Sequence, residues 1–199
     1  MRICWSFALH RLLPALSAAA LISVLPAAAP ADGTAPPFVL TSTTFAPGAT
    51  LPAFTASNGC ADDAENRSPA LAWSGAPAGT KSFALSIYDT DAPGGHGFWH
   101  WLMFDIPATT AHLAEGAGNP GTPAAVAGAV MGRNDFGTSS YGGPCPPGRD
   151  APHHYIFTLY ALDVAQLPGA STETMGPQVE DLLKGHVLAK ATVVGRFWR

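Results

Sequence analysis

SFALSIYDTDAPGGHGFWHWLMFDIP, the stretch from Ser82 to Pro107, contains two strand-like runs joined by a short loop. In the first run, Ser82 to Tyr88, successive side chains alternate between two faces, as in a β-strand. The second run, Trp99 to Ile106, is apolar on both faces apart from His100 and Asp105, as expected of a central strand. The stretch therefore predicts two adjacent strands at the centre of a sheet.

The loop and the strand ends beside it carry two carboxylates and two imidazoles, those of Asp89, Asp91, His96 and His100. Charged groups in or near a core cost several kcal/mol unless they are paired or bind something. This concentration of ionisable groups between buried strands indicates a functional site.

Strand signals continue on both sides of this stretch. We expect strands at Phe38–Ser42, Ala70–Ser74, Ala129–Gly132, Tyr155–Asp163 and Ala191–Trp198, a loop over Thr109–Gly128, and one helix at Val179–Ala189. No βαβ rhythm and no internal repeat is present. We predict a mostly β fold, a β-sandwich of largely antiparallel sheets with one or two peripheral helices.

The N-terminus is typical of an export signal. Two arginines flank the start of an apolar run, Leu12–Leu25, which is too short and too interrupted by proline to span a membrane comfortably, because a span needs about 20 residues. Ala29-Pro30-Ala31 offers the small residues that a signal peptidase reads. We expect residues 1–31 to be cleaved and residues 32–199 to form a single domain; an N-terminal helix that stays attached is the alternative. We therefore expect a periplasmic or secreted protein that is not stably inserted in a membrane.

The composition of the chain limits the kinds of molecule that it is expected to bind. The chain has 10 Lys and Arg against 14 Asp and Glu, a net charge of −4, and its basic residues are scattered singly. Nucleic acid is therefore not an expected partner. The 21 glycines and 19 prolines, with only 12% charged residues, favour short strands joined by many turns over a disordered chain.

Two of the three cysteines remain after removal of the signal, because Cys4 leaves with it. Cys60 and Cys145 form an even pair in an exported protein, which predicts one disulfide bond; two free thiols are the alternative. No CxxC spacing is present, so these cysteines do not predict a metal site.

Three segments hold most of the unusual polar residues. In chain order they read DTDAP from Asp89, WHW from Trp99, and YGGPCPPG from Tyr141, which is followed by HHY ending at Tyr155. Together with SPALAW from Ser68, this series resembles the phosphatidylethanolamine-binding protein family, and within it the bacterial branch of Raf-kinase-inhibitor-like proteins. The resemblance covers nearly the whole chain that follows the signal.

The resemblance implies a β-sandwich with a small pocket that accepts anions such as phosphate, phosphoryl head groups or acetate. Matched motif by motif, it assigns to that pocket Asp89, Pro93, His100, Cys145, Pro147, His153 and Tyr155. The chain departs from the family pattern at Thr90, where proline is usual, and at His154, where arginine is usual. It also stops soon after its last expected strand, where animal members carry a helix that screens the pocket, which weakens any transfer of lipid or kinase binding.

The residue types suit anion binding. A histidine titrates near pH 6.5, and a carboxylate such as Asp89 beside His100 or His153 favours the charged form. Imidazolium, tyrosine hydroxyl and backbone N–H groups then donate to an anion. Among secondary candidates, Asp91 is expected to cap the loop by bonding its N–H groups, and Trp99 to form core and pocket wall.

Three functions remain open. The leading one is an exported, non-catalytic binding protein for a small anionic or phosphorylated ligand, with no cofactor. The second is a protein-interaction module or inhibitor that binds a kinase or protease. The third is a metal-dependent hydrolase with Asp89, His100 and His153 as ligands, although the sequence contains neither HExxH nor a nucleophile elbow.

Overall fold

The computed structural model describes Met1 and residues 35–123 and 125–199 of the chain. The expected signal peptide, apart from Met1, lies outside the described residues. Residues Ala35–Arg199 form one unit by their mutual contacts. All statements below concern this unit.

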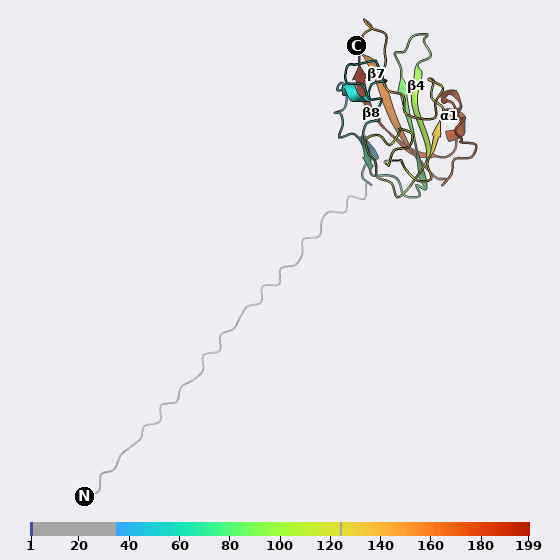
Figure 1. Ribbon diagram of the computed structural model, residues 1–199. Helices are drawn as coiled ribbons and strands as arrows, with labels where there is room; N and C mark the ends of the chain where they lie inside the picture. The colour runs from blue at the N-terminus through green and yellow to red at the C-terminus, as the bar shows by residue number, and fades with distance from the viewer. Residues whose placement is uncertain (2–34, 124) are drawn as a thin grey trace. The chain divides into compact units, whose positions relative to one another are not determined.

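The Ser82–Pro107 stretch forms two antiparallel strands, β3 (Ser82–Asp89) and β4 (Phe98–Pro107), as predicted. They lie inside a five-stranded antiparallel sheet of order β6-β4-β3-β7-β8, whose other members are β6 (Val130–Gly132), β7 (His153–Leu162) and β8 (Val187–Phe197). Figure 1 shows β7 and β8 side by side, and β4 in the same sheet. The central position predicted for β4 and β3 is therefore correct.

A smaller antiparallel sheet of order β1-β2-β5 is formed by β1 (Val39–Thr41), β2 (Leu71–Ser74) and β5 (His112–Leu113). Its apolar side chains, such as Trp73, share one buried core with Phe83 and Leu85 of β3. The opposite face of β3 and β4 packs against the helix α1 (Gly176–Leu183) through Val179 and Leu183. Alternation along the central strands therefore fills two separate cores, and the predicted mostly β fold with a peripheral helix is confirmed.

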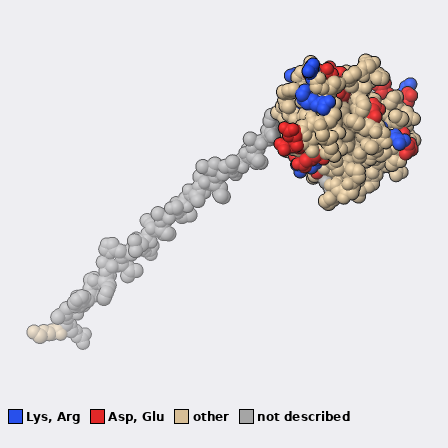
Figure 2. Space-filling view, turned by 45° about the horizontal axis from the view of Figure 1, so that its top comes forward, with Lys and Arg blue, Asp and Glu red and all other residues tan. Residues whose placement is uncertain are grey.

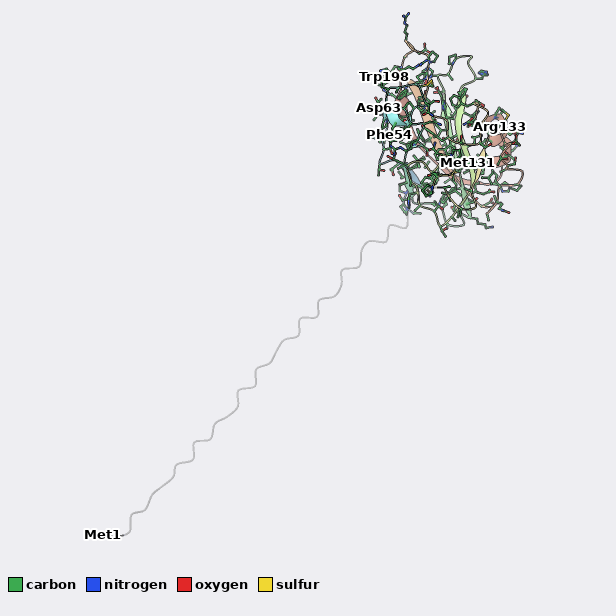
Figure 3. All side chains as sticks on the ribbon, viewed as in Figure 1. Met1, Phe54, Asp63, Met131, Arg133 and Trp198 are labelled. Carbon is green, nitrogen blue, oxygen red and sulfur yellow. A yellow bond between two sulfur atoms is a disulfide. The ribbon has the colours of Figure 1, made fainter. Side chains whose placement is uncertain are left out.

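A second helical turn is the 3₁₀ helix Ala53–Thr55. Within the described part of the chain, no helix combines the length and apolar character needed to cross a bilayer. The surface in Figure 2 is formed mostly by uncharged residues, with the basic side chains in small separate groups. Figure 3 places Met131 of β6 and the neighbouring Arg133 on the side of the molecule that carries α1.

The C-terminal third differs from the sequence prediction. The helix expected to run to Ala189 ends at Leu183, because Gly185 adopts a φ of 83°, which is outside the helical region and favours glycine. Val187 then starts β8, which pairs with β7 over its whole length. The short strand β5 lies within Thr109–Gly128, which was expected to be loop. At both places, pairing with a neighbouring strand outweighs the weak preference of the local sequence for a helix or a loop.

Candidate functional site

A cavity of about 200 Å³ opens at the edge of the large sheet where β3 ends and β4 and β7 begin. Ligand cavities for drug-sized molecules usually measure about 300–1,000 Å³, so this one suits a small molecule or a head group. The structure brings together here the residues that the sequence assigned to one pocket: Asp89, Pro93, His100, Cys145, Pro147, His153 and Tyr155.

Asp89 forms the base of the cavity. It is the last residue of β3 and pairs in register with Tyr155 of β7. Its side chain is buried, with 3% of the residue exposed. Oδ1 accepts a hydrogen bond from the Asp91 N–H at 2.9 Å, and Oδ2 accepts one from His153 Nδ1 at 2.8 Å. The carboxylate thus fixes both the start of the loop and the imidazole of His153.

His100 reaches the cavity because β4 contains a β-bulge. Ile87 and Tyr88 are consecutive on β3 but pair with Trp101 and Trp99, so His100 is an extra residue on β4. Regular alternation would place His100 and Trp101 on opposite faces. With the bulge, Trp101 enters the core that contains Ile87, and the His100 ring still lies 5.1 Å from that of Tyr155, between centroids.

The hydrogen bond at Nδ1 fixes the tautomer of His100. Nδ1 lies 2.7 Å from the carbonyl oxygen of Gly142, which can only accept, so the proton is on Nδ1. Nε2 faces Asp89 Oδ2 at 4.0 Å. Burial lowers the pKa of His100 below its ordinary 6.5, against the opposing effects of the Gly142 bond and of the Asp89 and Asp135 charges. Asp89 does favour the charged form of His100, as expected, but burial outweighs this effect, and Nε2 of the neutral ring is an acceptor.

A buried donor at the pocket lacks a well-formed hydrogen bond. The Tyr155 hydroxyl makes none of normal geometry to a described residue, although it interacts with the Asp89 side chain. Burial, reinforced by the charge of Asp89, raises the pKa of Tyr155, so the hydroxyl keeps its proton. The pocket therefore combines the acceptors Asp89 and His100 Nε2 with the Tyr155 hydroxyl as a donor.

A disulfide bond holds the pocket wall. Cys60 and Cys145 are joined, with 5.3 Å between their Cα atoms, which confirms the predicted pair. The same loop is fixed by its backbone, since the Gly143 N–H donates to Asn66 Oδ1 at 2.6 Å and the Gly142 N–H donates to the His100 carbonyl at 2.9 Å. The wall is thus tied to two distant segments of the chain.

Asp91 braces the loop in a way that the sequence did not predict. Its Oδ2 accepts hydrogen bonds from the backbone N–H of His154 at 2.7 Å and from His154 Nδ1 at 2.9 Å. Burial raises the pKa of Asp91, but these bonds and the charge of His154 outweigh it and lower the pKa overall. Asp89, and not Asp91, accepts the N–H bond that stabilises the turn. His96, which the sequence placed among these ionisable groups, is exposed and does not line the cavity.

Trp99 does not line the cavity. Its ring contacts that of Tyr88 in a tilted arrangement, with centroids 4.5 Å apart, and packs against the core on the α1 face of the sheet. The neighbouring Phe98 lines the cavity instead, together with Phe136, whose ring lies 4.7 Å from it and which is 45% exposed. Ala92 and Pro146 also contribute to the lining. The position of Phe98 two residues before His100 is a signal that could have identified it, whereas nothing in the sequence points to Phe136.

The geometry does not favour a metal centre built from Asp89, His100 and His153. Nδ1 of each histidine is used in a hydrogen bond, that of His153 to Asp89 itself. Within residues 35–123 and 125–199, no group of three or more His, Cys, Asp or Glu side chains is arranged to hold a metal ion. The ligand set of the hydrolase alternative is therefore not supported.

Comparison with known proteins agrees with the fold. Residues 41–198 match the sequence model of the family described as phosphatidylethanolamine-binding protein. The UPF0098 protein YbcL of Escherichia coli is 46% identical over 128 residues, which cover 64% of this chain and 69% of YbcL. The putative lipoprotein LppC of Mycobacterium tuberculosis is 36% identical over 179 residues, or 87% of this chain and 81% of LppC.

Comparison with solved structures points to the same family. The crystal structure of Escherichia coli YbcL, described as a new member of the mammalian PEBP family, superposes with a TM-score of 0.76 at 40% identity, over 81% of this chain and 98% of that one. A putative homologue from Chlamydia trachomatis, CT736, superposes with a TM-score of 0.69 at 31% identity, over 81% and 97%. From its sequence match and its fold, the chain belongs to the phosphatidylethanolamine-binding protein family.

Proposed function

We propose that this protein is an exported, non-catalytic binding protein whose pocket takes up a small oxyanion. The ligand is a free anion such as phosphate or acetate, or the phosphoryl or carboxyl head group of a larger molecule. The observation that carries the proposal is the buried hydroxyl of Tyr155, which belongs to the cavity lining and makes no hydrogen bond of normal geometry to a described residue. An unpaired buried donor costs about 1–3 kcal/mol, and a charged acceptor placed against it removes that cost.

The pocket's size and composition support a head group with a short apolar neighbour. The polar side chains lie at the base of the cavity, and Phe98 and Phe136 stand beside His100, with Phe136 open to solvent. An oxyanion fits the polar base, and any carbon substituent contacts the two aromatic rings. Apolar walls with a few placed polar groups are usual in small-molecule sites.

Binding without catalysis is favoured by the lack of an activated nucleophile in the described lining. The sulfur of Cys145 is held in a disulfide, and the raised pKa of Tyr155 makes its hydroxyl a poor nucleophile. Among the described residues, no serine or threonine lines the cavity. The Asp89–His153 pair therefore lacks a hydroxyl or thiol partner to activate.

Export is supported by two observations. A disulfide such as Cys60–Cys145 persists in oxidising compartments and is rare in the cytosol. A relative from Mycobacterium tuberculosis that matches 87% of this chain is named as a putative lipoprotein. Both agree with an envelope or extracellular location.

Isothermal titration calorimetry tests the proposal. Purified protein is titrated with sodium phosphate, phosphoethanolamine and sodium acetate, together with the variants Tyr155→Phe and Tyr160→Phe. Tyr160 lies on the same strand but outside the pocket, so it is the matched control. We expect saturable binding for at least one ligand, weakened about tenfold in Tyr155→Phe and unchanged in Tyr160→Phe. Folded protein that gives no saturable heat with any of the three contradicts the proposal.

A further inference from the structure

The loop between β3 and β4, residues 90–97, supplies one wall of the pocket through Ala92 and Pro93. Within the described part of the chain, neither of these two residues takes part in a hydrogen bond. On one side they follow Asp91, which is hydrogen-bonded, and on the other the next bonded residue is His96, through its carbonyl oxygen. The position of this wall therefore depends on the bonds of its two neighbours in the chain.

Asp91 is joined to β7 through a single residue, His154. Its Oδ2 accepts hydrogen bonds from the His154 backbone N–H at 2.7 Å and from His154 Nδ1 at 2.9 Å. The Thr90 N–H donates to the His154 carbonyl oxygen at 3.3 Å. All the hydrogen bonds found between the start of the loop and β7 therefore end on His154.

The strength of the side-chain bond depends on the charge of the imidazole. A carboxylate only accepts, so Nδ1 of His154 carries a proton, and the proton on Nε2 is the one that can be lost. With both protons the ring is a cation, and a charge-assisted bond is roughly twice as strong as a neutral one. Burial raises the pKa of Asp91, but the bonds from His154 hold it below its ordinary 3.8, so the carboxylate stays ionised. Between about pH 5 and pH 8 the histidine is the partner that can change its charge.

We propose that His154 is a positioning residue of the pocket: its imidazolium holds Asp91, and with it the Ala92–Pro93 wall, against β7, so that the wall is more ordered and the ligand is bound more tightly at acid than at alkaline pH. For the ligand, the inference rests on the proposed function. For the order of the wall it does not, because the bonds between Asp91 and His154 are present without a ligand.

Other charged groups adjoin the pair. They are Arg196 of β8, Arg149 and Asp150 before β7, His153 of β7, and His96 of the loop. Arg196 is paired with His154 across the two strands, so its charge opposes the imidazolium that Asp91 favours. Carboxylate and guanidinium groups ordinarily keep their charge between about pH 5 and pH 8. The test must therefore separate His154 from the other two histidines.

Hydrogen exchange measured by NMR on ligand-free protein tests the order of the wall. The probes are the backbone N–H groups of residues 91 and 154, which donate to Asp89 and to Asp91. Each rate is measured at about pH 5.5 and about pH 7.5 and corrected for the intrinsic rate at that pH. We expect wild-type protection of both groups to be about two- to fivefold greater at the lower pH. His154→Arg keeps its charge, so its protection should agree within about 1.5-fold at the two pH values.

Two further variants assign the effect to the charge. His154→Gln can still donate to Asp91 but carries no charge, so its protection should be low at both pH values. His96→Gln removes the exposed histidine of the same loop and should keep the wild-type ratio. Equal wild-type protection at the two pH values overturns the proposal. So does a His154→Arg variant that keeps the wild-type ratio, since the titrating group is then another histidine.

Calorimetric titration with sodium acetate tests the effect on binding, because a carboxylate is ionised at both pH values. The ratio of Kd at pH 7.5 to Kd at pH 5.5 should be about two- to fivefold larger in wild type than in His154→Arg. Equal ratios in the two proteins overturn the link between the loop and the pocket. Folded wild-type protein that binds no acetate counts against the proposed function, while the exchange ratios still decide the role of His154 in the order of the wall.

Discussion

His153 and Asp89 form a buried pair, with His153 Nδ1 donating to Asp89 Oδ2 at 2.8 Å and each residue 3% exposed. The next residue along β7, His154, makes the same kind of bond to Asp91 at 2.9 Å, but both of those side chains are 42% exposed. Two adjacent histidine–aspartate pairs thus share their chemistry and differ in their contact with water. The comparison separates the effect of burial from that of the bond.

The buried pair is expected to matter more for stability. In His153→Ala the Asp89 carboxylate loses its imidazole partner inside the protein, which should lower the free energy of unfolding by about 3 kcal/mol. His154→Ala should cost less than about 1 kcal/mol, because water screens an exposed pair. Urea denaturation followed by tryptophan fluorescence measures both. Equal losses in the two variants would contradict the pairing described here.

The pKa of His100 makes the stability depend on pH. Burial lowers the folded-state pKa below 6.5, so the unfolded chain binds more protons as the pH falls. The contribution is fully present above about pH 6.5 and is lost as the pH falls from there toward the folded-state pKa, by up to about 1.4 kcal/mol per pH unit. His100→Gln cannot titrate and should lose less stability than wild type between about pH 7 and pH 5. His112→Gln, at an exposed position in β5, is the control and should follow the wild type.

The Cys60–Cys145 bond closes a long loop, since the two residues are 85 positions apart. In the chain-entropy treatment a loop of this length gives about 4–5 kcal/mol of stabilisation. Cys60→Ala/Cys145→Ala should unfold at a lower urea concentration and bind phosphate more weakly, because Cys145 is part of the pocket wall. A reductant should shift the wild type toward the double variant and leave the double variant unchanged. If the reductant frees both thiols but leaves the urea concentration at which wild type unfolds unchanged, the prediction is contradicted.

Two glycines of the wall loop differ in the space around them. A Cβ on Gly143 would overlap the backbone carbonyl of Thr55, whereas one on Gly148 meets nothing within 4 Å. Gly143→Ala should therefore cost about 2 kcal/mol or more and displace the pocket wall. Gly148→Ala should stay within about 0.5 kcal/mol of wild type. Thermal unfolding and phosphate titration of both variants check the prediction.

The pocket could be predicted from sequence where motif order and strand register sufficed. Asp89 ends one strand and Tyr155 begins another, and their pairing in register brings both to one edge of the sheet. The expectation that Trp99 forms part of the pocket wall is wrong, because alternation from His100 places it on the other face of the sheet. What sequence could not supply was the β-bulge, which turns His100 and Trp101 to the same face, because a bulge depends on the pairing of two strands.

The other features that the sequence did not predict also depend on tertiary structure. Phe136 reaches the cavity from an irregular segment, with no periodic pattern that would place its ring beside Phe98. The charge of His100 depends on burial, which local sequence does not report. The sequence predicts a helix to Ala189 because Val179, Leu182, Leu183 and His186 recur at helical spacing, whereas pairing with β7 makes the segment from Val187 a strand.

A crystal structure grown in phosphate tests the central claim most directly, because it locates the anion and its partners together. The account predicts phosphate in the cavity, with one oxygen within about 3.2 Å of the Tyr155 hydroxyl and another within about 3.2 Å of His100 Nε2 or Asp89 Oδ2. A well-ordered cavity that contains only water, with phosphate bound elsewhere or not at all, would contradict it.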